Sequence, residues 1–245
     1  RRGDSPKTAA ADLALCRANV DRKMAEVAVT CLNPPRPGKP LLVLDLDNTL
    51  ADFKELTVEE PAPAIRGVGD LKRPFLDAFL AQVYPLFDLA IWSRSTWAAL
   101  EIKLNEMGHF DTEDFRYVFV LDREATVEVP LGAPEDPAYK FVKPLRLIWE
   151  AEPLGGAYGP HNTVHVDDLP RNFALNPQNG LTIQFWQYVD PTKDPAGHAR
   201  SVKDRELEYL LRYLRDLAAG AADWTGPRPR ASSAWCLRWW GWRRS

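Results

Sequence analysis

The sequence predicts an α/β protein built on a doubly wound parallel sheet flanked by helices. Short apolar runs typical of buried strands alternate along the chain with segments of helical periodicity, and this alternation favours a parallel sheet. Acidic and hydroxyl residues follow directly after several of the apolar runs. Because open sheets of this class bind ligands beyond the carboxyl ends of their strands, those residues are the first candidates for a functional site.

Four apolar runs are predicted to form the core sheet. Turn or breaker residues bound each run, and each is too short for a buried helix. The predicted strands are residues 41–44, 88–92, 164–166 and 181–185. Residues 117–129 alternate in polarity, which predicts a small antiparallel ribbon inserted between core elements, and residues 141–145 are expected to end a third ribbon strand.

Five segments have the spacing of amphipathic helices: residues 10–27, 74–84, 96–107, 145–151 and 202–217. Pro74 suits a first helical turn, and Gly108 suits the end of a helix. Residues 1–9 are expected to be flexible. The elements divide the chain into a linker with a helix at 1–37, an α/β domain at 38–220 and a tail at 221–245.

The tail differs in composition from the rest of the chain. Residues 226–245 contain five arginines, four tryptophans and no acid, without helical or strand periodicity. A cationic aromatic segment can bind a membrane surface or a protein partner. The absence of repeats and caps favours the alternative, a disordered end.

Composition excludes several classes of protein. The formal net charge of −3 gives no reason to expect a nucleic-acid partner. No apolar run reaches the roughly 18 residues that cross a bilayer, so no membrane partner is expected. The three cysteines are widely spaced and lack a zinc pattern, which indicates reduced thiols in a cytosolic or nuclear protein.

The string Asp45-Leu-Asp-Asn-Thr-Leu50 follows the first predicted strand and carries the main chemical hypothesis. Asp45 and Asp47 would enter one crevice, where backbone N–H groups of the turn can bind phosphate. Two carboxylates that face a phosphate require a hard cation, and oxygen ligands suit Mg²⁺. Asp45 could then attack phosphorus, and Asp47 could act as acid and base. The alternative is an ordinary turn rich in Asp and Asn.

Three further sites follow predicted strands or precede predicted helices. Ser93 could donate to a phosphoryl oxygen or cap the next helix, although Ser95 and Thr96 could cap equally well. Lys143 could neutralise developing charge or be a solvated lysine. The pair Asp167–Asp168 could ligate a metal or close a turn. The four strings together, each at such a position, favour the functional interpretation.

These motifs resemble the four motifs of the haloacid dehalogenase superfamily, and residues 30–218 resemble its FCP/SCP-type protein phosphatases. The likeness is greatest to members that carry a ubiquitin-like domain and act on the 26S proteasome in the nucleus. The strings that carry the resemblance are Leu32-Asn-Pro-Pro-Arg36, Leu41-Leu-Val-Leu-Asp45, Ile91-Trp-Ser93, Val142-Lys-Pro-Leu145 and Arg171-Asn-Phe-Ala-Leu-Asn-Pro-Gln-Asn-Gly180. The resemblance implies a haloacid-dehalogenase-like fold for residues 38–220, with no large cap.

The resemblance also implies a role for each site residue. Asp45 is the expected nucleophile and Asp47 the expected acid and base. Ser93 and Lys143 are the phosphate contacts that the resemblance implies, and Mg²⁺ is expected to contact Asp45, the Asp47 carbonyl oxygen, Asp167 and Asp168. Leu46, Asn48, Thr49 and Arg94 are further expected phosphate contacts, and Thr49 is also expected to hold the turn by hydrogen bonds. Two residues depart from the family pattern, because Asn48 stands where an aromatic residue is usual and Arg94 where a small residue is usual.

The expected substrate is phosphoserine or phosphothreonine in a protein. Spacings of 48 and 50 positions separate Asp45, Ser93 and Lys143, which leaves little chain for a cap that would enclose a small molecule. The resemblance implies a proteasome partner bound through a ubiquitin-like domain that would precede Arg1, and a location in the nucleus or the cytoplasm. The alternative substrate is a small phosphomonoester. The alternative functions are a phosphatase of the RNA polymerase II tail and a catalytically silent scaffold.

The histidines have no assigned role. His165 lies on a predicted core strand and is expected to be packed. The other three histidines fall near loops and are expected to be solvated: His109, His161 and His198.

Overall fold

The computed structural model of the chain describes residues 6–53, 71–133 and 136–220. Residues 1–5 and the tail at 221–245 lie outside this part, so the expectations about them lie outside the described residues. None of the described helices is long and apolar enough to cross a membrane.

Five parallel strands form the main sheet in the order β3-β2-β1-β6-β7. The strands are β1 (Leu41–Leu44), β2 (Asp88–Trp92), β3 (Tyr117–Leu121), β6 (Thr163–Asp167) and β7 (Gly180–Thr182). From β1 the chain builds the sheet first on one side and then on the other, so the predicted doubly wound sheet is confirmed. The direction of winding reverses between β1 and β6, and ligands of such sheets bind at this position.

Residues 117–129 form two separate elements, so the ribbon prediction is partly wrong. β3 is the edge strand of the main sheet, and all five of its residues are buried. A 3₁₀ turn, η2 (Arg123–Ala125), begins at the capping residue Asp122 and separates this strand from the ribbon. The antiparallel ribbon consists of β4 (Val127–Ala133) and β5 (Asp136–Val142), so residues 141–142 end a second ribbon strand and not a third.

The predicted helices are present with shifted ends. They are α1 (Pro6–Glu26), α2 (Leu76–Val83), α3 (Trp97–Glu106), α4 (Arg146–Trp149) and α6 (Glu206–Ala218). Residues 6–9, expected to be flexible, belong to α1. The helix expected at 202–217 begins only at residue 206, because a separate helix, α5 (Pro195–Ser201), precedes it. The strand expected at 181–185 ends at Thr182, and short 3₁₀ turns occur at η3 (Glu152–Leu154) and η4 (Pro170–Phe173).

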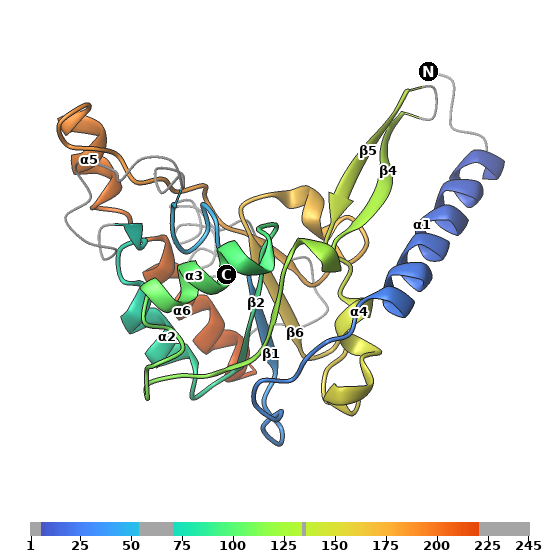
Figure 1. Cartoon of the computed structure of the whole chain (residues 1–245), viewed down its shortest axis with the longest axis horizontal. Coiled ribbons are helices and arrows are strands. Elements are labelled where there is room, and N and C mark those ends of the chain that lie inside the picture. The colour runs from blue at the N-terminus through green and yellow to red at the C-terminus, as the bar shows by residue number, and fades with distance from the viewer. Residues whose placement is uncertain (1–5, 54–70, 134–135, 221–245) are drawn as a thin grey trace, which may run out of the picture.

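Hydrophobic cores lie on both faces of the sheet because side chains of a strand alternate between its faces. On one face, Leu42 and Leu44 pack with buried residues of α2, α3 and α6. On the other, Leu41 and Val43 pack with residues of the ribbon and α4 and with Val20 of α1. Figure 1 shows these two groups of elements on opposite sides of the strands.

The proline-rich connector is tied to the amino end of the sheet by one buried carboxylate. Asp88 accepts hydrogen bonds from the backbone N–H and Nε of Arg36, at 2.9 and 2.6 Å, and from the Tyr158 hydroxyl at 2.7 Å. The Arg36 guanidinium also lies 3.9 Å from the centre of the Tyr84 ring. Upstream, Asn19 of α1 donates to the carbonyl oxygen of Glu128 in β4. The segment at 1–37 therefore contacts the domain through both its helix and its connector.

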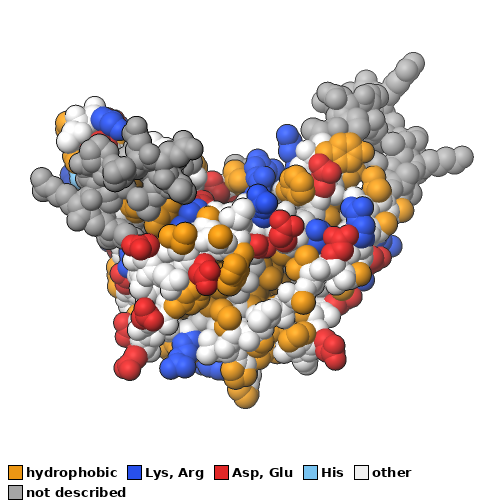
Figure 2. Space-filling model, in the orientation of Figure 1, with side chains coloured by type: hydrophobic (Ala, Val, Ile, Leu, Met, Phe, Trp, Pro, Cys, Tyr) orange, Lys and Arg blue, Asp and Glu red, His pale blue; other side chains and the backbone are white. Residues whose placement is uncertain are grey.

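The carboxyl ends of the strands open onto the hollowed side of the molecule. The ribbon and α5 rise on opposite sides of this edge (Figure 1). The space-filling view shows a depression between them (Figure 2). In the described part of the chain, this placement leaves the edge that carries the candidate residues open between the ribbon and α5.

Candidate active site

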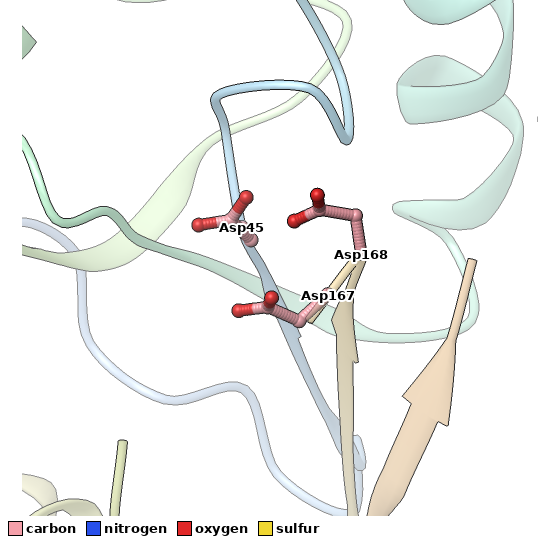
Figure 3. A group of neighbouring side chains, drawn as sticks. All are labelled: Asp45, Asp167 and Asp168. Atoms are coloured by element: carbon pink, nitrogen blue, oxygen red, sulfur yellow. The ribbon is translucent and has the colours of Figure 1, made fainter. Parts of the chain in front are cut away.

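Residues from separate parts of the chain meet at the carboxyl edge of the sheet, as the motifs predict. Asp45 follows β1, and Asp167 ends β6 with Asp168 directly after it (Figure 3). Lys143 follows β5, and its ammonium reaches both Asp45 and Asp167. The parallel pairing of β1 with β6 aligns the ends of these strands, which explains why acids more than a hundred positions apart become neighbours.

Three carboxylates form a group that fits a divalent cation. Each of Asp45, Asp167 and Asp168 offers an oxygen, and the three oxygens lie within 4.8 Å of one another. Carboxylate oxygens in such a group suit a hard cation such as Mg²⁺. The carboxylate of Asp47 is not part of the group.

Lys143 provides the positive charge opposite these acids. Its Nζ lies 2.5 Å from Oδ1 of Asp45 and 2.6 Å from Oδ2 of Asp167, and its side chain is fully buried. The charges of Asp167 and Asp45 raise the pKa of Lys143 despite its burial. Lys143 is therefore a buried cation whose charge is stabilised by two carboxylates, and the alternative of a solvated lysine is wrong.

One ammonium does not balance the three carboxylates. Burial raises the pKa of Asp45 above its ordinary value, with Lys143 opposing and Asp167 adding to the shift. Burial also raises the pKa of Asp168 to about 6, and the charge of Asp167 contributes. Both shifts arise because negative charge is crowded away from water. A second cation in this position would relieve the same repulsion.

The carboxylate of Asp47 turns toward α3 and away from the acid group. Ser93 and Ser95 donate to its Oδ2 at 3.1 and 2.9 Å. Lys103 of α3 donates to its Oδ1 at 2.5 Å. The Ser93 hydroxyl also accepts from the backbone N–H of Ser95 at 3.0 Å, whereas Thr96 caps α3. Ser93 is thus placed at the site and is not the helix cap.

The turn after β1 is fixed by its own backbone. The Leu46 carbonyl oxygen accepts from the N–H groups of Thr49, Leu50 and Ala51. The side chain of Leu46 is buried, so only its backbone could meet a phosphate. Among the described residues, no acceptor is bonded to the backbone N–H of Leu46 or Asp47, and these donors suit a bound anion.

Asn48 and Thr49 connect this turn to neighbouring loops. Asn48 has a left-handed backbone with φ 63°, and its side chain donates to the Trp186 carbonyl oxygen at 3.0 Å. Asparagine tolerates this conformation better than an aromatic residue would. The Thr49 hydroxyl accepts from the backbone N–H of Asp168 at 3.2 Å. Thr49 therefore joins the two acid-bearing loops.

A small pocket of about 170 Å³ lies over these residues. It is lined by Asp45, Asp47, Asn48, Arg94, Asp168, Leu169 and Asn172. Arg94 is exposed at this pocket, where its guanidinium can meet an anion.

Sequence reasoning missed Ser95 as an Asp47 partner, and it missed Lys103 and Asn172. Asn172 donates to Oδ2 of Asp167 at 2.7 Å and helps to hold that carboxylate. Asn172 lies within the long string at 171–180 that carries the family resemblance, and this position could have identified it as a site residue. Lys103 lies on a helix, and no local pattern separates it from a surface lysine.

The structure confirms the expectations for His165 and for the exposed His161, and it corrects the one for His109. His198 is half-buried, with Nδ1 2.8 Å from the Val189 carbonyl oxygen. His165 is packed between Trp92 and Phe173, with ring centroids at 5.9 and 5.0 Å. His109, expected to be solvated, is buried and its Nδ1 lies 2.9 Å from the Tyr117 hydroxyl. The apolar residues around β3 enclose it, and burial lowers its pKa.

Comparison with known proteins places these residues in context. Residues 40–225 match the family described as NLI interacting factor-like phosphatase. The chain is 38% identical over 201 residues to ubiquitin-like domain-containing CTD phosphatase 1 of Danio rerio, and 37% identical over 201 residues to that of Homo sapiens. These alignments cover 82% and 81% of this chain but only 57% and 56% of the relatives. The chain therefore spans little more than half the length of these relatives.

Solved structures give a more distant similarity. A structure of Fcp1, described as an essential RNA polymerase II CTD phosphatase, superimposes with a TM-score of 0.47 at 17% identity, over 84% of this chain and 66% of that chain. Fission yeast Fcp1-R271A bound to beryllium fluoride gives a TM-score of 0.45 at 17% identity over the same shares.

Proposed function

Because the chain belongs to the NLI interacting factor-like phosphatase family, we propose that it is a magnesium-dependent protein phosphatase that forms a phosphoryl intermediate on Asp45. The observation that carries the proposal is the position of Asp45. Its carboxylate lies in the acid group, 2.5 Å from the buried ammonium of Lys143, and lines the pocket. A nucleophilic carboxylate needs this combination of access and nearby positive charge.

The proposed reaction has two steps. A carboxylate oxygen of Asp45 forms a bond to phosphorus while the bond from phosphorus to the ester oxygen breaks. Asp47 gives its proton to the leaving alkoxide. In the second step Asp47 takes a proton from water, whose oxygen attacks the phosphorus. The bond between phosphorus and Asp45 breaks, and inorganic phosphate and the free carboxylate result.

The chain's own donors have clear tasks in these steps. The backbone N–H groups of Leu46 and Asp47 are available for phosphoryl oxygens, and Arg94 lines the same pocket. Ser93 donates to Asp47, which also lines that pocket. Lys143 stabilises charge on Asp45. A magnesium ion held by Asp45, Asp168 and the Asp47 carbonyl oxygen, with Asp167 beside them, would screen the phosphate from the acids. Asn48 and Thr49 fix the turn that carries these groups.

We propose phosphoserine and phosphothreonine in proteins as the substrates. The pocket is small, and the described residues form no domain that covers the carboxyl edge of the sheet, so a phosphorylated side chain on a protein surface can enter. Within this class we propose subunits of the 26S proteasome as targets in the nucleus. The relatives are named for a ubiquitin-like domain, which is the kind of module that this proposal would use for docking.

A second candidate target is the C-terminal tail of RNA polymerase II, because the relatives are named as CTD phosphatases. The two targets are distinguished by comparing rates of phosphate release. Phosphorylated proteasomes and phosphorylated tail heptapeptides are assayed at equal concentrations of phosphosites. A scaffold without activity is the remaining alternative, and it would release phosphate from neither.

The reaction is tested with p-nitrophenyl phosphate and a phosphoserine peptide. We expect hydrolysis of both that needs Mg²⁺, and that the Asp45→Asn variant loses at least about 10³-fold in kcat because it removes the nucleophile. Acid quench of the wild type with ³²P-labelled substrate should trap label on the protein, and Asp45→Asn should trap none. Activity that survives in Asp45→Asn would refute the assignment.

A further inference from the structure

We propose that Lys103 is a positioning residue that holds the carboxylate of Asp47 on the leaving-group side of the site. The inference rests on the proposed function, because it assigns a task within that reaction. It concerns an ordinary helix position, Lys103 of α3, which none of the strand-end motifs includes.

The contacts define the arrangement. The Nζ of Lys103 lies 2.5 Å from Oδ1 of Asp47 and 2.8 Å from Oγ of Ser95. The Ser93 and Ser95 hydroxyls donate to the other oxygen, Oδ2, at 3.1 and 2.9 Å. One lysine of α3 and two hydroxyls of the loop between β2 and α3 therefore fix both oxygens of this carboxylate.

The side chain of Lys103 is largely enclosed, so its bond to Asp47 differs from an ion pair on the protein surface. Long side chains on a helix lean toward its N-terminus, and α3 begins at Trp97, next to the site. The side chain is 16% exposed, and Nζ lies 5.6 Å from the centre of the Phe53 ring. An ammonium bonded to Asp47 and Ser95 and covered by a ring has little freedom to bind a substrate anion directly.

Two lysines keep the two aspartates of the turn apart. Lys143 binds Asp45 and draws it to the acids of β6, whereas Lys103 binds Asp47 and draws it to α3. A carboxylate that ligated the cation could not carry a proton to the leaving oxygen. By anchoring Asp47 to α3, Lys103 keeps this carboxylate off the cation site and beside the Ser93 hydroxyl.

The test compares a poor leaving group with a good one. A phosphoserine peptide releases an alkoxide that needs a proton, whereas p-nitrophenyl phosphate releases a phenolate that needs little help. Because general acid catalysis contributes about 10²–10⁴-fold, we expect Lys103→Met to lower kcat on the peptide about 30-fold or more. The same variant should lower kcat on p-nitrophenyl phosphate less than about 3-fold, and both KM values should stay within about 2-fold.

Lys103→Arg keeps a cation that can reach Asp47 and should recover most of the peptide activity. Lys72→Met is the matched control. Lys72 has a similar exposure of 17% and a similar ion pair, 2.9 Å from Asp77, but its Nζ also donates to the carbonyl oxygen of Met107, away from the pocket. Lys72→Met should leave the ratio of the two activities unchanged. Circular dichroism spectra confirm that each variant is folded before it is assayed.

A double variant shows whether Lys103 acts through Asp47. In the Asp47→Asn background, adding Lys103→Met should change peptide kcat less than about 2-fold, since coupled residues are not additive. Equal losses on the two substrates, a loss confined to KM, or additive losses in the double variant would overturn the inference. If Asp47→Asn lowered kcat on the peptide no more than kcat on p-nitrophenyl phosphate, Asp47 would not be the general acid. The inference about Lys103 would then fail as well. Labelling of Asp45 would still test the nucleophile separately.

Discussion

At the scale of single residues, two lysines organise the site, and the sequence predicts the role of one far better than that of the other. Lys143 stands in a short string between a predicted strand and a predicted helix, and the structure places it between Asp45 and Asp167. Lys103 lies on a helix surface in the sequence pattern, yet it bonds to Asp47. The difference is physical, because strand ends converge at one edge by topology, whereas the direction of a helical side chain depends on what packs around it.

Removing the charge of Lys143 should make folding depend on magnesium. In Lys143→Met the buried carboxylates of Asp45 and Asp167 lose their shared cation, and breaking a buried pair costs about 3–5 kcal/mol. Urea denaturation without Mg²⁺ should show a loss of this size in the free energy of unfolding. Added Mg²⁺ should restore part of it, because a bound cation compensates the same charges.

The half-buried Lys39 provides the control for that measurement, since its Nζ donates to the Pro85 carbonyl oxygen at 2.6 Å and, among the described residues, forms no ion pair. Lys39→Met should change stability by less than about 0.5 kcal/mol, as expected for a surface substitution. A Lys143→Met protein as stable as the wild type without Mg²⁺ would contradict the account of Lys143 as the counter-charge.

The remaining site residues differ in how far the sequence could predict them. Asp45, Asp167 and Asp168 follow apolar runs, and the sheet brings these runs together, so their meeting was predictable. Asn48 was predicted to contact phosphate, and its described contacts are those of a turn, with a left-handed backbone and a bond to Trp186. That task depends on a partner far along the chain, which no local pattern reveals.

At the scale of elements, the carboxyl edge is shaped by how short connections hold the strands. The long string at 171–180 illustrates this, because it contains η4 and the start of β7. Phe173 of η4 packs over Gly180 and against the ring of His165 on β6. Asn172 beside it holds Asp167. Residues 171–180 therefore contain no catalytic group themselves, but their packing holds the carboxylate of Asp167 in the acid group.

Gly180 should be intolerant of a side chain. A Cβ at this position would lie 2.1 Å from Cγ of Phe173, a contact that cannot exist without movement. We expect Gly180→Ala to destabilise the protein by about 1–3 kcal/mol in urea denaturation, as overpacked cores do. Combining it with Phe173→Leu should give a smaller loss than the sum of the single losses. Additive losses would show that the two positions do not share one packing contact.

The elements also show where periodicity was misleading. Tyr117–Leu121 was assigned to the ribbon, although this run of buried residues is an edge strand of the main sheet. The alternation that follows belongs to β4, and the turn at Asp122 separates the two. The helix α5 was missed although Asp194 followed by Pro195 is a recognisable start signal. Its seven residues were too few to show a helical period.

At the scale of the whole molecule, the fold unites two groups of elements around one acidic edge. The core on one face includes α2, α3 and α6, and the core on the other includes α4 and the ribbon. Asp45 and Asp168 directly follow the neighbouring strands β1 and β6, so the acid group draws on the central part of the sheet. A ligand at this position is bound only by the folded chain, since unfolding separates residues 45 and 168.

Magnesium should therefore stabilise the entire domain against heat. Binding to the folded state alone adds about 2.7 kcal/mol when free Mg²⁺ is 100 times its Kd. For a chain of this size each kcal/mol corresponds to about 2–4 °C. Circular dichroism melts should show Tm rising by about 5–10 °C between EDTA and saturating Mg²⁺.

Variants of two acids separate specific binding from general salt effects. Asp168→Asn removes one oxygen ligand and its charge, so the rise in Tm with Mg²⁺ should fall to a small fraction of the wild-type value. Glu101→Gln changes an exposed acid on α3 that is not part of the acid group, and it should leave the rise intact. If both variants retained the full rise, the ion would be acting elsewhere on the molecule. The stabilisation would then say nothing about Asp45 and its neighbours.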